Sequence, residues 1–177
     1  KAYQTQNIRN VVLLGSTKAG KTTLSEAMLY EGKVIDRRGT VEGKNTVSDN
    51  AEIEQMNQRS IYATPLYAEF MDTKFNIIDT PGADDFVGGA VSAFKVCDTG
   101  VLVVNAQQGV EVGTQIYSRY AKEYGIPMIV AVNQLDGEKA SWETVLESMK
   151  EAFGNKPVVV QYPVNVGPGF DGFIDVL

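Results

Sequence analysis

The chain has 177 residues, of which 44% are hydrophobic and 21% charged, as in a single domain with a buried core, and it has no apolar run long enough to cross a membrane. The sequence contains no histidine, which excludes Ser-His-Asp catalysis, histidine general-base chemistry and histidine metal ligands within this chain. A single cysteine predicts a reducing, cytoplasmic compartment, and a net charge of −6 argues against loose electrostatic binding to nucleic acid.

Apolar runs alternate with helical patterns along the chain. Strands are expected at residues 8–14, 61–70, 73–79, 100–105, 127–132 and 157–161. Helices are expected at residues 22–30, 86–97, 111–124 and 138–153, with a short helix near 52–56 inside a long polar loop over 32–60. This alternation predicts an α/β fold with helices on both faces of a mostly parallel sheet. The tight turn between the second and third strands adds one antiparallel strand pair.

The segment after the first strand matches the phosphate-binding pattern G-x-x-x-x-G-K-[ST], from Gly15 to Thr22. In such a loop the backbone N–H groups surround the phosphates, the side chain of Lys21 reaches their β and γ oxygens, and the Thr22 hydroxyl ligates Mg²⁺. The N-terminus of the following helix also favours an anion. Nucleotide contacts are therefore expected from Ser16, Thr17, Lys18, Ala19, Gly20, Lys21, Thr22 and Thr23.

Two more motifs follow predicted strands. The first is Asp79-Thr-Pro-Gly82, at the end of the predicted strand over 73–79. There Asp79 is placed to hold the water shell of Mg²⁺, and the Gly82 N–H is placed to contact a γ-phosphate. The second runs from Asn133 to Asp136, whose carboxylate can accept two hydrogen bonds from guanine that adenine does not offer. Asp136 therefore predicts GTP or GDP as the ligand and disfavours an ATPase. Gln134 replaces the lysine of the usual N-K-x-D pattern, so the affinity for the nucleotide is expected to fall more than the preference for guanine over other bases.

Together these motifs resemble the N-terminal part of the G domain of elongation factor G, the ribosomal translocase, over nearly all of the chain. The resemblance is carried by the run from Asn76 to Gly82, by Asp85-Phe86, by Ser48-Asp49 and by the Asn133–Asp136 element. It implies a P-loop GTPase fold, a three-layer sandwich, that binds GTP or GDP with Mg²⁺ and docks on the ribosome as a cytoplasmic monomer without membrane partners. It also implies that residues 1–177 are a partial G domain of a longer multidomain factor. The family's Ser-Ala guanine loop and its four following domains are expected beyond the 177 residues. Release factors and ribosome-protection proteins share the motifs and remain alternatives.

The departures from the family pattern concern hydrolysis. An ungapped alignment places Ser60 at the family's Mg²⁺-binding threonine, so the metal ligands Thr22, Ser60 and Asp79 are retained. Ala83 stands where the family has the histidine that orients the attacking water, so no catalytic residue is intact. Thr17 and Arg59 replace two apolar residues beside that histidine. The chain resembles a second paralogue with altered catalytic residues, and weak or absent GTP hydrolysis is expected. An active ribosome-stimulated GTPase of the same family is the alternative.

Lys18 stands where the family has an aspartate, a position at which related GTPases can hold a monovalent ion beside the phosphates. Two interpretations stay open, a solvated lysine or a built-in cation near the nucleotide. Cys97 is expected to pack in the core.

Overall fold

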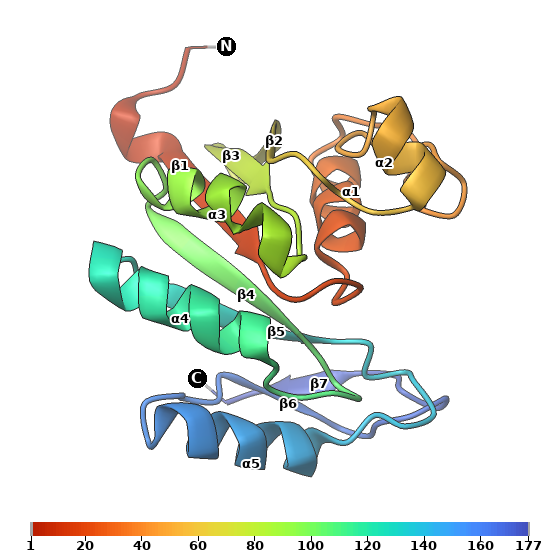
Figure 1. Cartoon of the computed structure of the whole chain (residues 1–177), viewed down its shortest axis with the longest axis vertical. Coiled ribbons are helices and arrows are strands. Elements are labelled where there is room, and N and C mark those ends of the chain that lie inside the picture. Colours follow the sequence, from red (N-terminus) through yellow and green to blue (C-terminus); the bar gives the residue numbers. More distant parts are fainter. Residues whose placement is uncertain (1, 177) are drawn as a thin grey trace.

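The computed structural model describes residues 2–176, apart from the side chain of residue 84, and is built around a five-stranded sheet (Figure 1). The strand order is β2-β3-β1-β4-β5. The strands are β1 (Ile8–Leu14), β2 (Thr64–Phe70), β3 (Thr73–Asp79), β4 (Thr99–Asn105) and β5 (Met128–Asn133). All neighbours are parallel except β2, which runs antiparallel to β3 at the edge. The carboxyl ends of β1, β3, β4 and β5 therefore meet along one edge of the sheet, where α/β proteins place their ligands.

Alternate residues of the central strand β1 face two separate cores, because side chains of a strand alternate between its faces. Val11 and Leu13 pack with Leu24 and Met28 of α1 (Lys21–Glu31). Val12 and Leu14 pack in a larger cluster on the other face. That cluster is formed with side chains of α3 (Val87–Phe94), α4 (Val112–Tyr124) and α5 (Trp142–Phe153). The sheet thus lies between two helical layers, as the sequence predicts.

Several predicted boundaries shift for identifiable reasons. The second strand begins three residues late because the backbone N–H groups of Ile61 and Tyr62 donate to Glu54 instead of to a neighbouring strand. The predicted helix over 86–97 is shorter in the structure. A 3₁₀ turn, η2 (Asp84–Phe86), precedes it, and the helix ends at Phe94. The predicted helix over 138–153 begins four residues late, where the Ser141 side chain accepts a hydrogen bond from the Thr144 N–H as an N-cap.

The predicted strand at residues 157–161 is wrong in place, and the observed strand lies outside the main sheet. The strand is β6 (Gln161–Pro163), and it pairs with β7 (Phe173–Asp175) in a separate two-stranded antiparallel sheet. The apolar run before Gln161 signals extended backbone, but periodicity does not reveal which segment an extended run will pair with. At the N-terminus a 3₁₀ turn, η1 (Thr5–Asn7), leads into β1. Within the described residues, no helix is both long and apolar enough to cross a membrane.

Candidate nucleotide-binding site

The phosphate-binding loop connects the end of β1 to the start of α1. Its tight path requires positive φ at Gly15 (141°), Lys18 (64°) and Gly20 (100°). A side chain at Gly15 would collide with the backbone of β4, and one at Gly20 with the Asn133 amide, so both positions need glycine. Figure 1 shows the loop at the carboxyl edge of the sheet, below the first turn of α1.

Lys21 is the buried cation of this loop. Its Nζ donates to the carbonyl oxygens of Gly15 at 2.8 Å and Ser16 at 3.0 Å, so the side chain folds back along the loop. Burial lowers the pKa of the Lys21 ammonium to about 8, although the nearby carboxylates of Asp79 and Asp49 oppose that shift. At neutral pH the group is therefore a buried positive charge with only partial compensation.

The three predicted metal ligands come together beside Lys21. The Thr22 hydroxyl donates to Asp79 Oδ2 at 2.9 Å and lies 3.2 Å from the Ser60 hydroxyl. Asp79 is only 1% exposed, and this burial raises the pKa of its carboxyl group. Residues far apart in the sequence thus form one cluster of oxygen atoms, buried at Thr22 and Asp79 and half-buried at Ser60.

Two carboxylate oxygens of this region, Asp79 Oδ1 and Asp49 Oδ2, are buried and have no hydrogen-bond partner in the part of the chain that is described. Buried oxygens without partners are costly unless a cation or water satisfies them. Carboxylate and hydroxyl oxygens are the ligands that Mg²⁺ prefers, so the residues present fit that ion. Among the described residues, no group of three or more acidic or cysteine side chains is arranged to hold a metal ion, so hydroxyl groups would have to complete such a site. The sequence motifs assign no role to Asp49, although it is one of the residues that carry the family resemblance.

Two buried carboxylates on helices hold the long polar loop above this cluster. Glu26 of α1 accepts hydrogen bonds from the backbone N–H groups of Gly39 at 2.7 Å and Val47 at 2.6 Å. Glu54 of the predicted short helix, α2 (Glu52–Asn57), accepts from Ile61 at 2.9 Å and Tyr62 at 3.0 Å. These anchors bring Arg59 and Ser60 over the phosphate-binding loop.

Together the segments enclose a cavity of about 650 Å³, within the size range of small-molecule sites. Of the predicted residues it is lined by Thr17, Lys18, Gly20, Lys21, Thr22, Thr23, Arg59, Ser60, Gly82 and Gln134. Gly82 closes tightly on the loop, since a Cβ there would lie 2.5 Å from Lys21 Nζ and 2.6 Å from the Thr17 N atom. This close approach places the Gly82 backbone beside the phosphate-binding loop.

Ala83 directly follows Gly82 but does not line the cavity. Its side chain is a methyl group, which can neither donate nor accept a hydrogen bond. The two polar residues predicted beside it, Thr17 and Arg59, do line the cavity. The position predicted for water orientation therefore offers no polar side-chain group.

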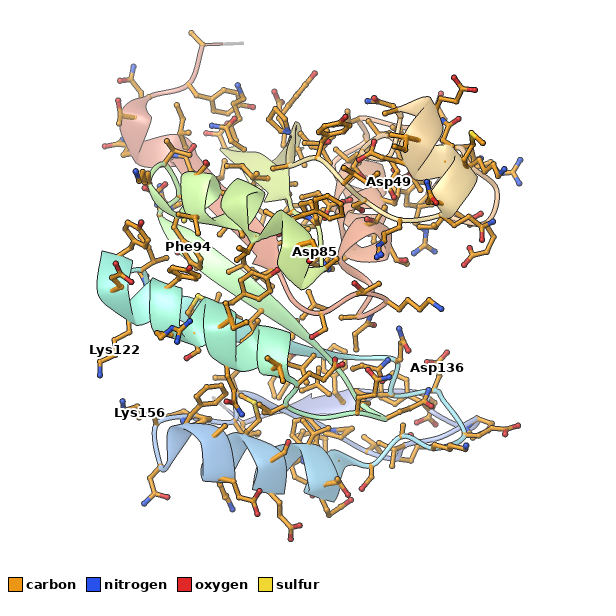
Figure 2. All side chains as sticks on the ribbon, in the orientation of Figure 1. Asp49, Asp85, Phe94, Lys122, Asp136 and Lys156 are labelled. Atoms are coloured by element: carbon orange, nitrogen blue, oxygen red, sulfur yellow. The ribbon has the colours of Figure 1, made fainter. Side chains whose placement is uncertain are left out.

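At the other end of the cavity, two side-chain amides at the end of β5 contact the phosphate-binding loop. Asn133 Nδ2 donates to the Ala19 carbonyl at 3.0 Å, and Gln134 Nε2 donates to the Lys18 carbonyl at 2.9 Å. Asp136 is exposed and lines a neighbouring groove along α5 instead of this cavity. Figure 2 shows Asp136 on the loop before α5 and Asp49 on the loop near α2, with the phosphate-binding loop between them. The structure thus joins Asn133 and Gln134 to the site, and the base-reading role of Asp136 stays a prediction.

Comparisons with known proteins agree with the site's chemistry. Residues 6–173 match the family model described as the elongation factor Tu GTP binding domain. The chain is 35% identical over 170 residues to an elongation factor G-like protein of Mycobacterium tuberculosis, covering 96% of this chain and 23% of that protein. It is 30% identical over 172 residues to peptide chain release factor 3 of Enterococcus faecalis, covering 95% of this chain and 33% of that protein.

A crystal structure of a protein from Thermus thermophilus superposes with a TM-score of 0.89 at 32% identity, covering 96% of this chain and 25% of that chain. The chain thus spans about a quarter to a third of the length of these relatives.

Proposed function

Because this chain belongs to the elongation factor Tu GTP-binding domain family, we propose that residues 1–177 are part of the G domain of a longer, elongation factor G-like translation factor. Guanine-nucleotide binding follows from the family. Docking on the ribosome and action in translocation are proposed on the resemblance to elongation factor G. The relative named peptide chain release factor 3 keeps a release-factor role as the alternative translation step.

The observation that carries the nucleotide proposal is the cluster of Thr22, Ser60 and Asp79 beside the buried Lys21. A desolvated ammonium group favours a polyanionic ligand, because phosphate oxygens would replace the hydration that burial removes. We assign the Lys21 ammonium and the backbone N–H groups of residues 16–23 to the phosphates. Thr22, Ser60 and Asp79 would hold Mg²⁺, which when bound neutralises charge on the β and γ oxygens.

We further propose that hydrolysis of the bound GTP is weak or absent. In-line attack on a γ-phosphate requires a water held at the correct angle, and losing the orienting group costs several kcal/mol of transition-state stabilisation. Ala83 supplies no such group, and the whole sequence contains no histidine. The protein would then act as a nucleotide-dependent binding module on the ribosome. The alternative is an active ribosome-stimulated GTPase that positions the water by other means.

Calorimetric titration of the full-length protein with GDP and with ADP, each with Mg²⁺, tests the nucleotide proposal. GDP is expected to bind at least a hundredfold more tightly than ADP, and Asp136→Ala is expected to remove most of that preference. The Glu143→Ala variant on α5 is the matched control, because it removes a carboxylate outside both cavities and should keep the preference. Equal affinity for GDP and ADP in the wild-type protein would overturn the assignment of guanine nucleotide.

A further inference from the structure

Asn105, the last residue of β4, lines the cavity and is connected to the phosphate-binding loop by consecutive hydrogen bonds through Gln134. Its Oδ1 accepts from the Gln107 backbone N–H at 2.8 Å. Its Nδ2 donates to Gln134 Oε1 at 2.8 Å, and Gln134 Nε2 in turn donates to the Lys18 carbonyl. We call the side chains of Asn105 and Gln134 the amide pair. Neither sequence motifs nor the proposed function gives Asn105 a role.

The orientation of the amide pair is fixed by backbone groups at its two ends. The Gln107 N–H can only donate, so the oxygen of Asn105 must face it. The Lys18 carbonyl can only accept, so the nitrogen of Gln134 must face it. The Asn105 nitrogen and the Gln134 oxygen are then left facing each other, as observed. Reversing either amide would place like groups together.

The amide pair also bridges two residues with left-handed backbone. Lys18 has a φ of 64° and Gln134 a φ of 61°, a conformation that residues other than glycine seldom adopt. Such positions persist when surrounding contacts hold them. Asn105 is only 7% exposed, and Gln134 Oε1 is the acceptor that its amide nitrogen uses. The pair, buried at Asn105 and half-buried at Gln134, thus braces the phosphate-binding loop.

We propose that Asn105 and Gln134 form a charge-neutral positioning pair that fixes the shape of the phosphate-binding loop for the nucleotide. This inference rests on the proposed function. In this pair Gln134 does not act as a weakened lysine. A lysine at position 134 would direct an ammonium donor at the Asn105 amide nitrogen, which is itself a donor. An aspartate at position 105 would accept from both the Gln107 N–H and that ammonium. The residues at 105 and 134 must therefore change together.

The test is a double-mutant cycle on the full-length protein, with Gln134→Lys, Asn105→Asp and the double variant titrated with GDP. Each single change is expected to weaken GDP binding about tenfold. The double variant is expected to return to within about threefold of wild type. The Gln115→Ala variant removes an exposed glutamine on α4 and serves as the control, with an affinity within about twofold of wild type. A lysine that strengthens binding on its own, or single effects that simply multiply, would overturn the pairing.

Inosine diphosphate, which lacks the exocyclic amine of guanine, separates positioning from base reading. Gln134→Ala is expected to weaken GDP and inosine diphosphate by the same factor, because it acts on the phosphate-binding loop. Asp136→Ala is expected to change the ratio between them. A Gln134→Ala variant that changes that ratio would contradict a positioning role and make Gln134 a base contact.

Amide hydrogen exchange in the nucleotide-free protein distinguishes failure of this inference from failure of the proposed function. Gln134→Ala is expected to speed exchange at residues 18–20 at least fivefold, and Gln115→Ala is expected to leave it unchanged. Unchanged exchange in Gln134→Ala would overturn the amide pair, whatever the nucleotide result. If Gln134→Ala exchanges faster but the wild-type protein binds no guanine nucleotide, the proposed function is overturned and the amide pair is supported.

Discussion

The cavity wall formed by Lys21 and Thr22, with Asp79 behind them, differs sharply from the wall formed by Gly82, which Ala83 follows outside the cavity. In the first, the Thr22 hydroxyl donates to the Asp79 carboxylate, the Lys21 ammonium donates to backbone carbonyls of the loop, and burial lowers the pKa of Lys21 to about 8. In the second, a glycine backbone lies against the loop and is followed by a methyl group. The first wall has the groups that we propose bind phosphate, and the second lacks a side chain that could direct water. In this proposal binding and hydrolysis depend on different residues, so one can persist without the other.

The largest expected effect comes from removing the charge of the first wall. Lys21→Met keeps the side-chain length but removes the ammonium group, and hydrogen bonds to charged groups contribute about 1.5–3 kcal/mol each. We expect GDP affinity to fall at least a hundredfold in calorimetric titration. If Lys21→Met binds GDP within tenfold of wild type, Lys21 does not bind the phosphates.

The same lysine should make the stability of the nucleotide-free protein depend on pH. Its pKa is about 8 in the folded protein and about 10.5 in the unfolded chain, so the unfolded state binds more protons between these values. Stability therefore rises with pH in that window, by up to about 3 kcal/mol from this group. Urea unfolding at pH 7.5, 8.5 and 9.5 should show a steeper rise for wild type than for Lys21→Met. Parallel curves for the two proteins would contradict the buried charge.

Gly82→Ala probes the second wall sterically. The added methyl group would approach the backbone at Ser16 and Thr17, which must shift to admit it. We expect a loss of stability of about 2 kcal/mol in urea unfolding, as for other overpacked positions. Gly88→Ala is the matched control, because a Cβ on that exposed face of α3 meets no atom within 4 Å. It should stabilise the protein by up to about 1 kcal/mol. Equal effects at the two glycines would refute the close approach of Gly82.

Lys18 should give the smallest effect, because its side chain is exposed at the rim of the cavity. A built-in cation there predicts that Lys18→Met weakens GDP binding about threefold, an effect that should shrink with added salt. A solvated lysine predicts no change. Titration at low and high salt decides between the two interpretations.

The sequence predicts the parts of the molecule that short patterns encode. The α/β fold and the resemblance to the G domain of elongation factor G are confirmed, and the phosphate-binding loop lies between β1 and α1 as expected. Local glycine spacing and apolar runs carry that information. The strand predicted at residues 157–161 begins only at Gln161, because its position is set by pairing with β7, which no local pattern reveals.

Contacts between distant residues are what the sequence does not reveal. Glu26 binds the backbone of a loop 13 and 21 residues away, and Asn105 meets Gln134 across 29 residues. No periodicity marks these side chains, because each acts through a partner that only the folded chain brings near. Asp136 differs from these residues. Its motif is visible in the sequence, but the ligand that it would contact is not part of the chain. Its role therefore stays a prediction.

We propose that this domain binds guanine nucleotide and hydrolyses GTP poorly. Rapid-quench kinetics of the full-length protein with GTP and ribosomes measures this directly. We expect turnover at least about a hundredfold slower than that of a histidine-bearing translocase. Ala83→His should recover only part of the rate, because Thr17 and Arg59 keep the surroundings polar. Wild-type turnover comparable to that of the histidine-bearing translocase would contradict poor hydrolysis by this domain.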